Sequence, residues 1–247
     1  MKTFKKKIKK SHIFLISAIL VFSLTVGACA IYLGDYYRAD LESVEAFLSV
    51  NEVEYYENKS GDYVFEPEVA NAGFIFYPGG KVEVEAYLPL MAKISSMGIL
   101  CVAVKMPFNL AVFDINAAEG IKEAFPNIEN WYIGGHSLGG SMAAEYISNH
   151  SKGFDGLILL GSYSTSNLSE SSIKVLSVYG SEDGVLNREK YSKNLSNLPL
   201  NFKEIIIDGG CHAYFGVYGE QEGDGIAKIS VEKQVEISAN AIIDFIK

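Results

Sequence analysis

From residue 72 to its C-terminus, the chain alternates short apolar runs with longer amphipathic stretches, and this pattern constrains the fold more than any other feature. The apolar runs cover residues 73–77, 99–104, 131–133, 157–160, 175–179 and 202–207. Helices are expected between them, near residues 84–97, 115–125, 138–150, 187–197 and 231–246. The pattern predicts an α/β fold, a mostly parallel twisted sheet with helices on both faces. Ligands of such sheets bind beyond the carboxyl ends of the strands.

Two shorter features precede this region. Residues 53–56 and 63–65 resemble strands on either side of a polar turn at residues 58–61. Residues 35–51 have apolar positions at helical spacing. No internal repeat or linker divides the remainder, so we expect a linking helix at 35–51 and one domain at 52–247.

The N-terminal segment, residues 1–34, has the composition of a membrane anchor. Residues 13–33 carry no charge and follow six lysines within the first ten residues. Because about 20 helical residues cross a bilayer, this run is long enough to span one. The lysines favour a cytoplasmic N-terminus and an extracytoplasmic domain. Two alternatives remain: a cleaved signal peptide whose apolar part ends near Val26, or a lipoprotein acylated at Cys29.

Charge and cysteine content exclude several classes of protein. The chain carries a net charge of −9 despite the N-terminal lysines, so it lacks the basic face that nucleic acid requires. Its three cysteines, one of them in the apolar segment, do not form a disulfide scaffold. The four histidines are scattered without metal-ligand spacing. We therefore expect no metal and no cofactor.

A candidate nucleophile lies in Gly135-His136-Ser137-Leu138-Gly139, which matches the pattern G-x-S-x-G. The motif follows an apolar run and precedes a helical stretch, as a nucleophile at a tight strand-to-helix turn requires. The flanking glycines leave room for this turn. The alternative is a serine that caps a helix beside packing glycines.

A serine hydroxyl needs a base, and the base needs a carboxylate that fixes its tautomer. His212 follows the last apolar run through a glycine-rich loop, and Asp183 follows the preceding one. His136 is a poor base because neighbours on a turn point apart, and His150 ends a helix. Competitors for Asp183 are Glu182 and Asp208. The chain order Ser137, Asp183, His212 is that of α/β-hydrolases.

An oxyanion site requires backbone N–H donors near the nucleophile. We expect one from Leu138, directly after Ser137, and the second from Gly80 in the loop Pro78-Gly79-Gly80-Lys81. Its glycines allow close approach of the backbone to a substrate, although an ordinary turn would have the same composition.

Residues 72–246 resemble the α/β-hydrolase superfamily, and in particular small lidless members related to dienelactone hydrolases. The matching segments are FIFYPGGK (74–81), GGHSLGG (134–140), YGSEDGV (179–185) and DGGCHAYFG (208–216). The resemblance implies a serine esterase mechanism with the triad Ser137, Asp183 and His212. The chain departs from it at Pro78, where many relatives have histidine, and by its serine, since dienelactone hydrolases use a cysteine nucleophile.

The expected function is hydrolysis of a small carboxylic ester through an acyl-serine intermediate at the outer face of the membrane. Two alternatives are a thioesterase, amidase or acyltransferase with the same triad, and a non-catalytic, membrane-tethered binding module. Only 14 residues (161–174) separate the run 157–160 from the run 175–179, too few for a helical lid. Aromatic and apolar residues at the expected active end are candidates for a substrate pocket: Phe108, Leu110, Val112, Phe113, Tyr163, Tyr214 and Phe215.

Overall fold

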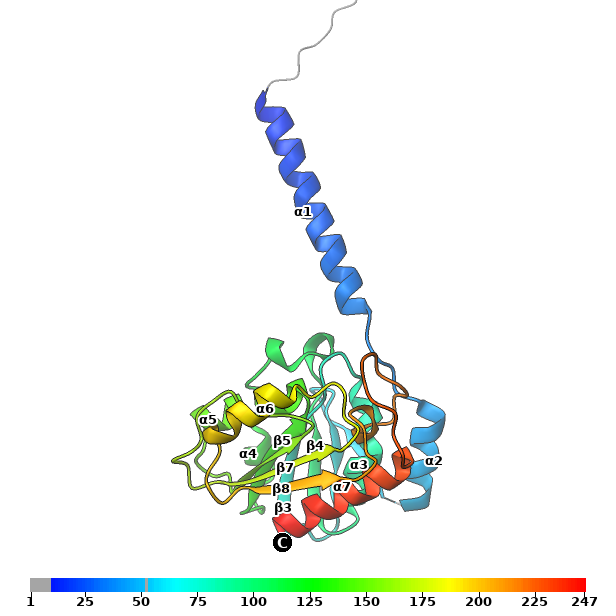
Figure 1. Ribbon diagram of the computed structural model, residues 1–247, viewed down its shortest axis with the longest axis vertical. Helices are drawn as coiled ribbons and strands as arrows, with labels where there is room; N and C mark the ends of the chain where they lie inside the picture. Colours follow the sequence, from blue (N-terminus) through cyan, green and yellow to red (C-terminus); the bar gives the residue numbers. More distant parts are fainter. Residues whose placement is uncertain (1–9, 52) are drawn as a thin grey trace, which may run out of the picture. The chain divides into compact units, whose positions relative to one another are not determined.

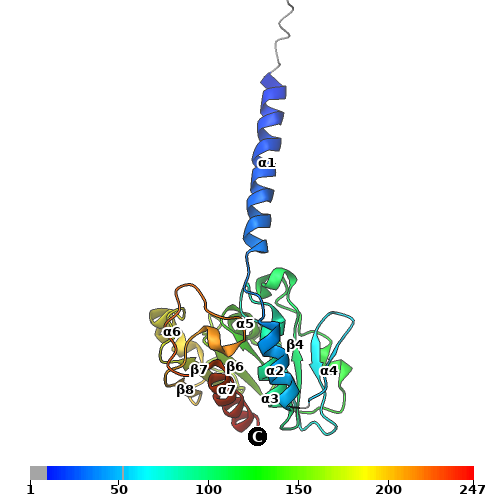
Figure 2. The ribbon, with the colours of Figure 1, turned by 90° about the vertical axis from the view of Figure 1, so that its right-hand side faces the viewer.

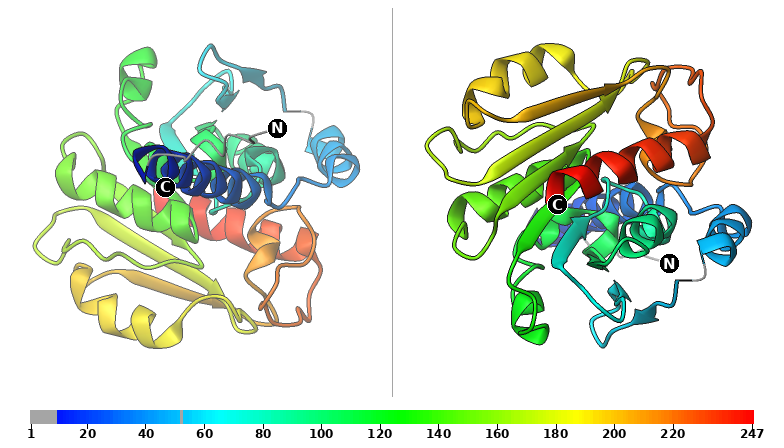
Figure 3. Two further views of the ribbon diagram at one scale, coloured as in Figure 1. Left: turned by 90° about the horizontal axis from the view of Figure 1, so that it is seen from above. Right: turned by 90° about the horizontal axis from the view of Figure 1, so that it is seen from below.

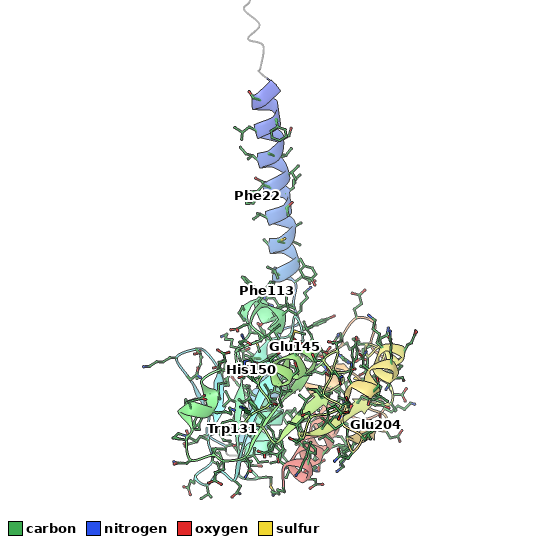
Figure 4. All side chains as sticks on the ribbon, turned by 90° about the vertical axis from the view of Figure 1, so that its left-hand side faces the viewer. Phe22, Phe113, Trp131, Glu145, His150 and Glu204 are labelled. Atoms are coloured by element: carbon green, nitrogen blue, oxygen red, sulfur yellow. The ribbon has the colours of Figure 1, made fainter. Side chains whose placement is uncertain are left out.

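The computed structural model describes residues 10–51 and 53–247, which form two compact units with the division between Tyr36 and Tyr37. The lysine-rich residues 1–9, from which the orientation in the membrane is predicted, lie outside the described residues. The first unit contains helix α1 (Lys10–Gly34). Its stretch Ser17–Gly34 has a mean hydropathy of 2.0, and its apolar side chains, such as Phe22, are exposed (Figure 4). By length and composition α1 suits a membrane span, although a signal sequence would meet the same criteria.

Within the described residues, the second unit is built on an eight-stranded sheet of order β1-β2-β4-β3-β5-β6-β7-β8 (Figure 1). The strands are β1 (Tyr56–Glu57), β2 (Tyr63–Phe65), β3 (Ala72–Tyr77), β4 (Ile99–Ala103), β5 (Trp131–His136), β6 (Gly156–Leu160), β7 (Lys174–Gly180) and β8 (Lys203–Ile207). The six strands from β4 to β8 in this order are parallel, and β1 and β2 are antiparallel. The predicted fold class is confirmed.

Helices cover both faces of the sheet, as the apolar strands require. Phe74 and Phe76 of β3 pack toward α3 (Leu88–Ser95) and α7 (Val231–Ile246). Ile75 and Tyr77 point to the opposite face and pack with α5 (Leu138–Asn149). Figures 2 and 3 show α7 and α3 on one side of the sheet and α5 (Leu138–Asn149) and α6 (Arg188–Asn194) on the other. Short helix α4 (Ile121–Ala124) lies beside the second face.

Helix α2 (Leu41–Asn51) begins six residues later than predicted. Asp40 caps it: the N–H of Ser43 donates to Asp40 Oδ1 over 3.3 Å, and the Ser43 hydroxyl donates to Oδ2 over 2.7 Å. The preceding residues are extended, because the N–H of Tyr37 donates to Lys81 O and Tyr37 O accepts from Glu83. Apolar side chains of α2, among them Val44, join the core cluster around α3 and α7.

The helix predicted at residues 115–125 is wrong over most of its length, since only Ile121–Ala124 is α-helical. Tyr77 explains the difference. Its hydroxyl donates to Ile115 O over 2.8 Å and accepts from the N–H of Ala118 over 2.9 Å, so two backbone groups of this segment bind a side chain. The chain before it forms two short 3₁₀ turns, η2 (Pro107–Asn109) and η3 (Ala111–Phe113). The predicted strand at 53–56 is also displaced, to Tyr56–Glu57.

Candidate active site

Ser137 occupies a strained turn between β5 and α5. Its φ of 51° and ψ of −121° lie where residues with a side chain are rare. The neighbouring strand stabilises this conformation, because the N–H of Ser137 donates to Leu160 O over 2.8 Å and Ser137 O accepts from the Ser162 hydroxyl over 2.6 Å. The side chain is half-buried at the carboxyl end of the sheet.

The glycines that flank Ser137 allow this turn to pack against the loop after β3. A Cβ at residue 139 would overlap the carbonyl oxygens of Tyr77 and Pro78, and one at residue 135 would overlap Tyr77 O. These are backbone atoms of buried residues, which cannot move aside easily. Glycine at 135 and 139 is therefore required by the close approach of two backbones.

His212 and Asp183 form a buried pair. His212 Nδ1 lies 2.8 Å from Asp183 Oδ2, and the two side chains are 1% and 0% exposed. The second oxygen of Asp183 accepts from the N–H groups of Val185 (3.0 Å) and Leu186 (2.8 Å), so the carboxylate cannot rotate freely. A carboxylate only accepts, so Nδ1 carries the hydrogen and Nε2 of a neutral His212 is a proton acceptor.

Ser137 and His212 line one cavity of about 250 Å³ at the carboxyl ends of β5 and β6. The remaining lining residues are Leu138, Ser141, Gly161, Ser162, Tyr163, Val185, Leu186 and Asn187. His212 Nε2 is buried and has no hydrogen-bond partner among the described residues. The structure thus brings all three predicted triad residues to one edge of the sheet, with the acceptor nitrogen of His212 beside the cavity that contains Ser137.

The competing residues lie elsewhere. Glu182 binds Lys228 Nζ over 2.7 Å at the surface, and Asp208 is exposed. His150 lies at the end of α5, 3.8 Å from Glu119, where Figure 4 shows it. Of the three candidate carboxylates, Asp183 is therefore the one that hydrogen-bonds to His212.

The oxyanion loop, residues 78–81, packs against the residue after the nucleophile. A Cβ at Gly80 would lie 2.8 Å from Leu138 Cδ2. The N–H groups of the residues on either side of Gly80 already have acceptors. The N–H of Gly79 donates to Tyr87 Oη over 3.1 Å, and the N–H of Lys81 donates to Asn109 O over 2.7 Å. Among the described residues, the N–H of Gly80 has no acceptor. The N–H of Leu138, in the first turn of α5, has no intrahelical partner either. Both are available to a ligand.

The apolar residues expected near the site are dispersed. Tyr163 lines the cavity with Ser137, whereas Phe215 is fully buried and Tyr214 lines a different cavity. Phe108 and Phe113 are 61% and 56% exposed. Figure 4 shows Phe113 at the opposite end of the second unit from Trp131, the first residue of β5.

Asp224 is a residue of the site that the sequence did not reveal. Its Oδ1 accepts from the N–H groups of Gly184 (3.0 Å), His212 (3.1 Å) and Gly225 (2.8 Å), and its Oδ2 accepts from Ala213 (2.8 Å). Burial raises the pKa of this carboxyl, but the four N–H donors lower it more, so the pKa lies below its ordinary value. Asp224 therefore joins the loop that carries the acid to the loop that carries the base.

Gln234 of α7 hydrogen-bonds to the backbone of the loop that carries His212. It is fully buried, its Oε1 accepts from the N–H of Cys211 over 2.9 Å, and its Nε2 donates to Cys211 O over 2.7 Å. In the sequence, Asp224 sits in a charged, glycine-rich turn and Gln234 in an amphipathic helix, so neither has a local signal of this role.

A comparison with known families agrees with the resemblance found in the sequence. The model of the alpha/beta hydrolase family matches residues 73–236. The chain belongs to this family. Alpha/beta hydrolases place a nucleophile at the strand-to-helix turn occupied here by Ser137. The resemblance seen in the sequence is confirmed, and the chain is a member of a family of hydrolases. A search of curated proteins found no match.

Solved structures share the fold at low sequence identity. Dienelactone hydrolase from Anabaena variabilis is 12% identical with a TM-score of 0.55, covering 79% of this chain and 99% of that one. Est1E from Butyrivibrio proteoclasticus is 13% identical with a TM-score of 0.55, covering 78% and 96%. A predicted CIB-like hydrolase from Thermoplasma acidophilum is 17% identical with a TM-score of 0.52, covering 78% and 98%. These solved structures support the fold of the present chain.

Replacing Asp224 by asparagine tests its role as a clamp. The asparagine side chain keeps one acceptor oxygen, but its NH₂ group is a donor and cannot accept a hydrogen bond from a backbone N–H. We expect the Asp224→Asn variant to lose about 1–3 kcal/mol in the free energy of unfolding, measured in urea at pH 7. Because the pKa of Asp224 is lowered in the folded state, this difference should shrink as the pH falls below the ordinary aspartate value of about 3.9.

The matched control is Asp244→Asn, at an exposed position of α7. It should leave the free energy of unfolding within about 0.5 kcal/mol of the wild type. Equal stability of the two variants would show that Asp224 does not clamp the loops.

Proposed function

We propose that this alpha/beta hydrolase is a serine hydrolase that cleaves a small carboxylic ester through an acyl-Ser137 intermediate. The observation that carries the proposal is the buried His212–Asp183 pair, whose histidine lines the same cavity as Ser137. A hydroxyl at a strained turn, beside an imidazole whose tautomer is fixed by a buried carboxylate, is the arrangement that activates serine as a nucleophile.

In the proposed reaction, Ser137 Oγ attacks the ester carbonyl while His212 Nε2 accepts the hydroxyl proton. The N–H groups of Leu138 and Gly80 stabilise the oxyanion of the tetrahedral intermediate. Asp183 keeps the hydrogen on Nδ1 and stabilises the imidazolium. His212 then protonates the leaving alkoxide as the carbon–oxygen bond breaks. Water, deprotonated by His212, hydrolyses the acyl-serine and regenerates the hydroxyl of Ser137.

The size of the cavity supports a small substrate. About 250 Å³ lies below the usual range of drug-sized sites. The chain between β6 and β7 (161–173) contains no helix, so no helical lid from this segment covers the cavity. The triad would also serve a thioesterase, amidase or acyltransferase. Rates with matched ester, thioester and anilide substrates separate these activities, and a chain that cleaved none of them would be a binding module.

Labelling with a fluorophosphonate probe tests the nucleophile. We expect the wild-type chain to be labelled at Ser137, and Ser137→Ala to lose both labelling and hydrolysis of p-nitrophenyl acetate by about 10³-fold or more. The control Ser148→Ala, further along α5, should be labelled at the wild-type rate. Absence of labelling in a folded wild-type chain, or labelling that survives Ser137→Ala, would refute the assignment.

We infer further that α1 anchors the domain on the extracytoplasmic face of a membrane. The inference rests on the apolar stretch Ser17–Gly34 and on the lysines that precede α1 in the sequence. Cys29 on α1 keeps a lipoprotein open as the alternative.

The intact mass of the chain purified from membranes separates these cases. Anchoring by an uncleaved α1 predicts the mass of the full sequence, apart from removal of Met1, and no change in membrane retention for Cys29→Ser. A lipoprotein would instead begin at an acylated Cys29 and would lose its lipid in that variant. Recovery of a chain cleaved near residue 26 in the soluble fraction would contradict both.

A further inference from the structure

His136, the residue before Ser137, belongs to a buried network outside the triad. Its side chain is 1% exposed, and its Nδ1 lies 2.8 Å from the hydroxyl of Tyr87, which is fully buried. The same hydroxyl accepts from the N–H of Gly79, in the oxyanion loop, over 3.1 Å. A Cβ at Gly79 would lie 2.6 Å from Tyr87 Oη and 2.7 Å from His136 Nδ1, so this network leaves room only for glycine.

The donors in this network can be assigned. The Gly79 N–H can only donate, so the Tyr87 oxygen accepts from it and keeps its own hydrogen for His136 Nδ1. A neutral His136 then carries its hydrogen on Nε2, which is buried and has no hydrogen-bond partner among the described residues. Burial lowers the pKa of His136 well below its ordinary value, and the neighbouring His212 lowers this pKa further. His136 is therefore neutral near pH 7.

The imidazole of His136 also supports the base. The ring centroids of His136 and His212 are 4.4 Å apart, at an interplanar angle of 47°, and Phe215 lies against His136 with centroids 5.3 Å apart. Three segments thus meet at one side chain: the oxyanion loop through Tyr87, the turn of Ser137 through the chain itself, and the loop of His212 by ring contact. A positive charge on His136 would destabilise, by repulsion, the positive charge that His212 acquires during the proposed reaction. A neutral ring beside His212 avoids this repulsion.

We propose that His136 and Tyr87 are positioning residues that hold the oxyanion loop and the ring of His212 in place around Ser137. The proposal rests on the serine hydrolase function proposed above. The hydrogen bond from Gly79 to Tyr87 sets the position of the adjacent Gly80 N–H, and the ring of His136 sets the plane of His212. Neither residue touches the substrate, so both act on the rate of the chemical step rather than on binding.

Kinetics of the full-length chain in detergent, with p-nitrophenyl acetate, test the proposal. Tyr87→Phe removes the hydroxyl and leaves the ring, so we expect kcat to fall about tenfold to hundredfold with KM changed less than about twofold. His136→Phe, which keeps a ring but accepts no hydrogen bond, should have a similar effect. His136→Asn, whose amide oxygen can accept from Tyr87 but which lacks the ring against His212, should recover only part of kcat.

Tyr191→Phe is the matched control for loss of a buried hydroxyl. Tyr191 is 4% exposed, and its hydroxyl bonds to Ser177 Oγ (2.9 Å) and Glu204 Oε1 (2.6 Å), partners outside this network. Its removal should lower thermal stability and leave kcat within about twofold of the wild type. An unchanged kcat in Tyr87→Phe, with an active wild type, would overturn the positioning role alone. A folded wild type that hydrolyses no ester and resists fluorophosphonate would overturn the hydrolase function as well.

Selective ¹⁵N labelling of the four histidines gives a readout independent of activity. We expect His136 to show the Nε2–H tautomer at pH 7 and no titration around the ordinary histidine value of about 6.5. Its Nδ1 resonance should shift in Tyr87→Phe and stay unchanged in Tyr191→Phe. A hydrogen on Nδ1, or titration near pH 6.5, would overturn the proposal whatever the enzyme hydrolyses.

Discussion

The candidate site depends on one backbone constraint, the turn that holds Ser137 at a φ of 51°. Leu160 O and the hydroxyl of Ser162 bind the backbone of this residue from the side of β6, so the strain is supported by the sheet. Because the same turn packs its glycines on Tyr77 and Pro78, it also determines where the oxyanion loop lies. The position of the half-buried hydroxyl and the free N–H groups of Gly80 and Leu138 are thus consequences of one close contact between two backbones.

The base is held by interactions at longer range in the sequence. The loop of His212 is bonded to Asp183 by the imidazole, to Asp224 by backbone N–H groups and to Gln234 through Cys211. Buried polar groups bonded in this way favour one arrangement of a loop, because each broken bond leaves an unpaired group away from water. A glycine-rich loop such as 208–212, flexible in isolation, is in this way held in the position that general base catalysis needs.

The sequence predicted the parts of this arrangement that have local signals. The apolar strands, the glycines around Ser137, and the positions of Asp183 and His212 after successive strands follow from pattern and order along the chain. Asp224, Gln234 and Tyr87 act through partners that are distant in the sequence, namely Ala213 at 11 positions, Cys211 at 23 and His136 at 49, and no local pattern predicts such contacts. The same reason explains why the helix predicted at 115–125 does not form over most of its length. The hydroxyl of Tyr77, about 40 residues earlier in the chain, hydrogen-bonds to the backbone of this segment.

A crystal structure of the chain after reaction with a dialkyl fluorophosphate would test the central claim most directly. The account predicts phosphorus bonded to Ser137 Oγ, with the phosphoryl oxygen about 2.7–3.1 Å from the backbone nitrogens of Leu138 and Gly80. The ring of His212 should face the adduct through Nε2 and keep its bond to Asp183. Phosphorus on another side chain, or a phosphoryl oxygen directed away from both nitrogens, would contradict the account.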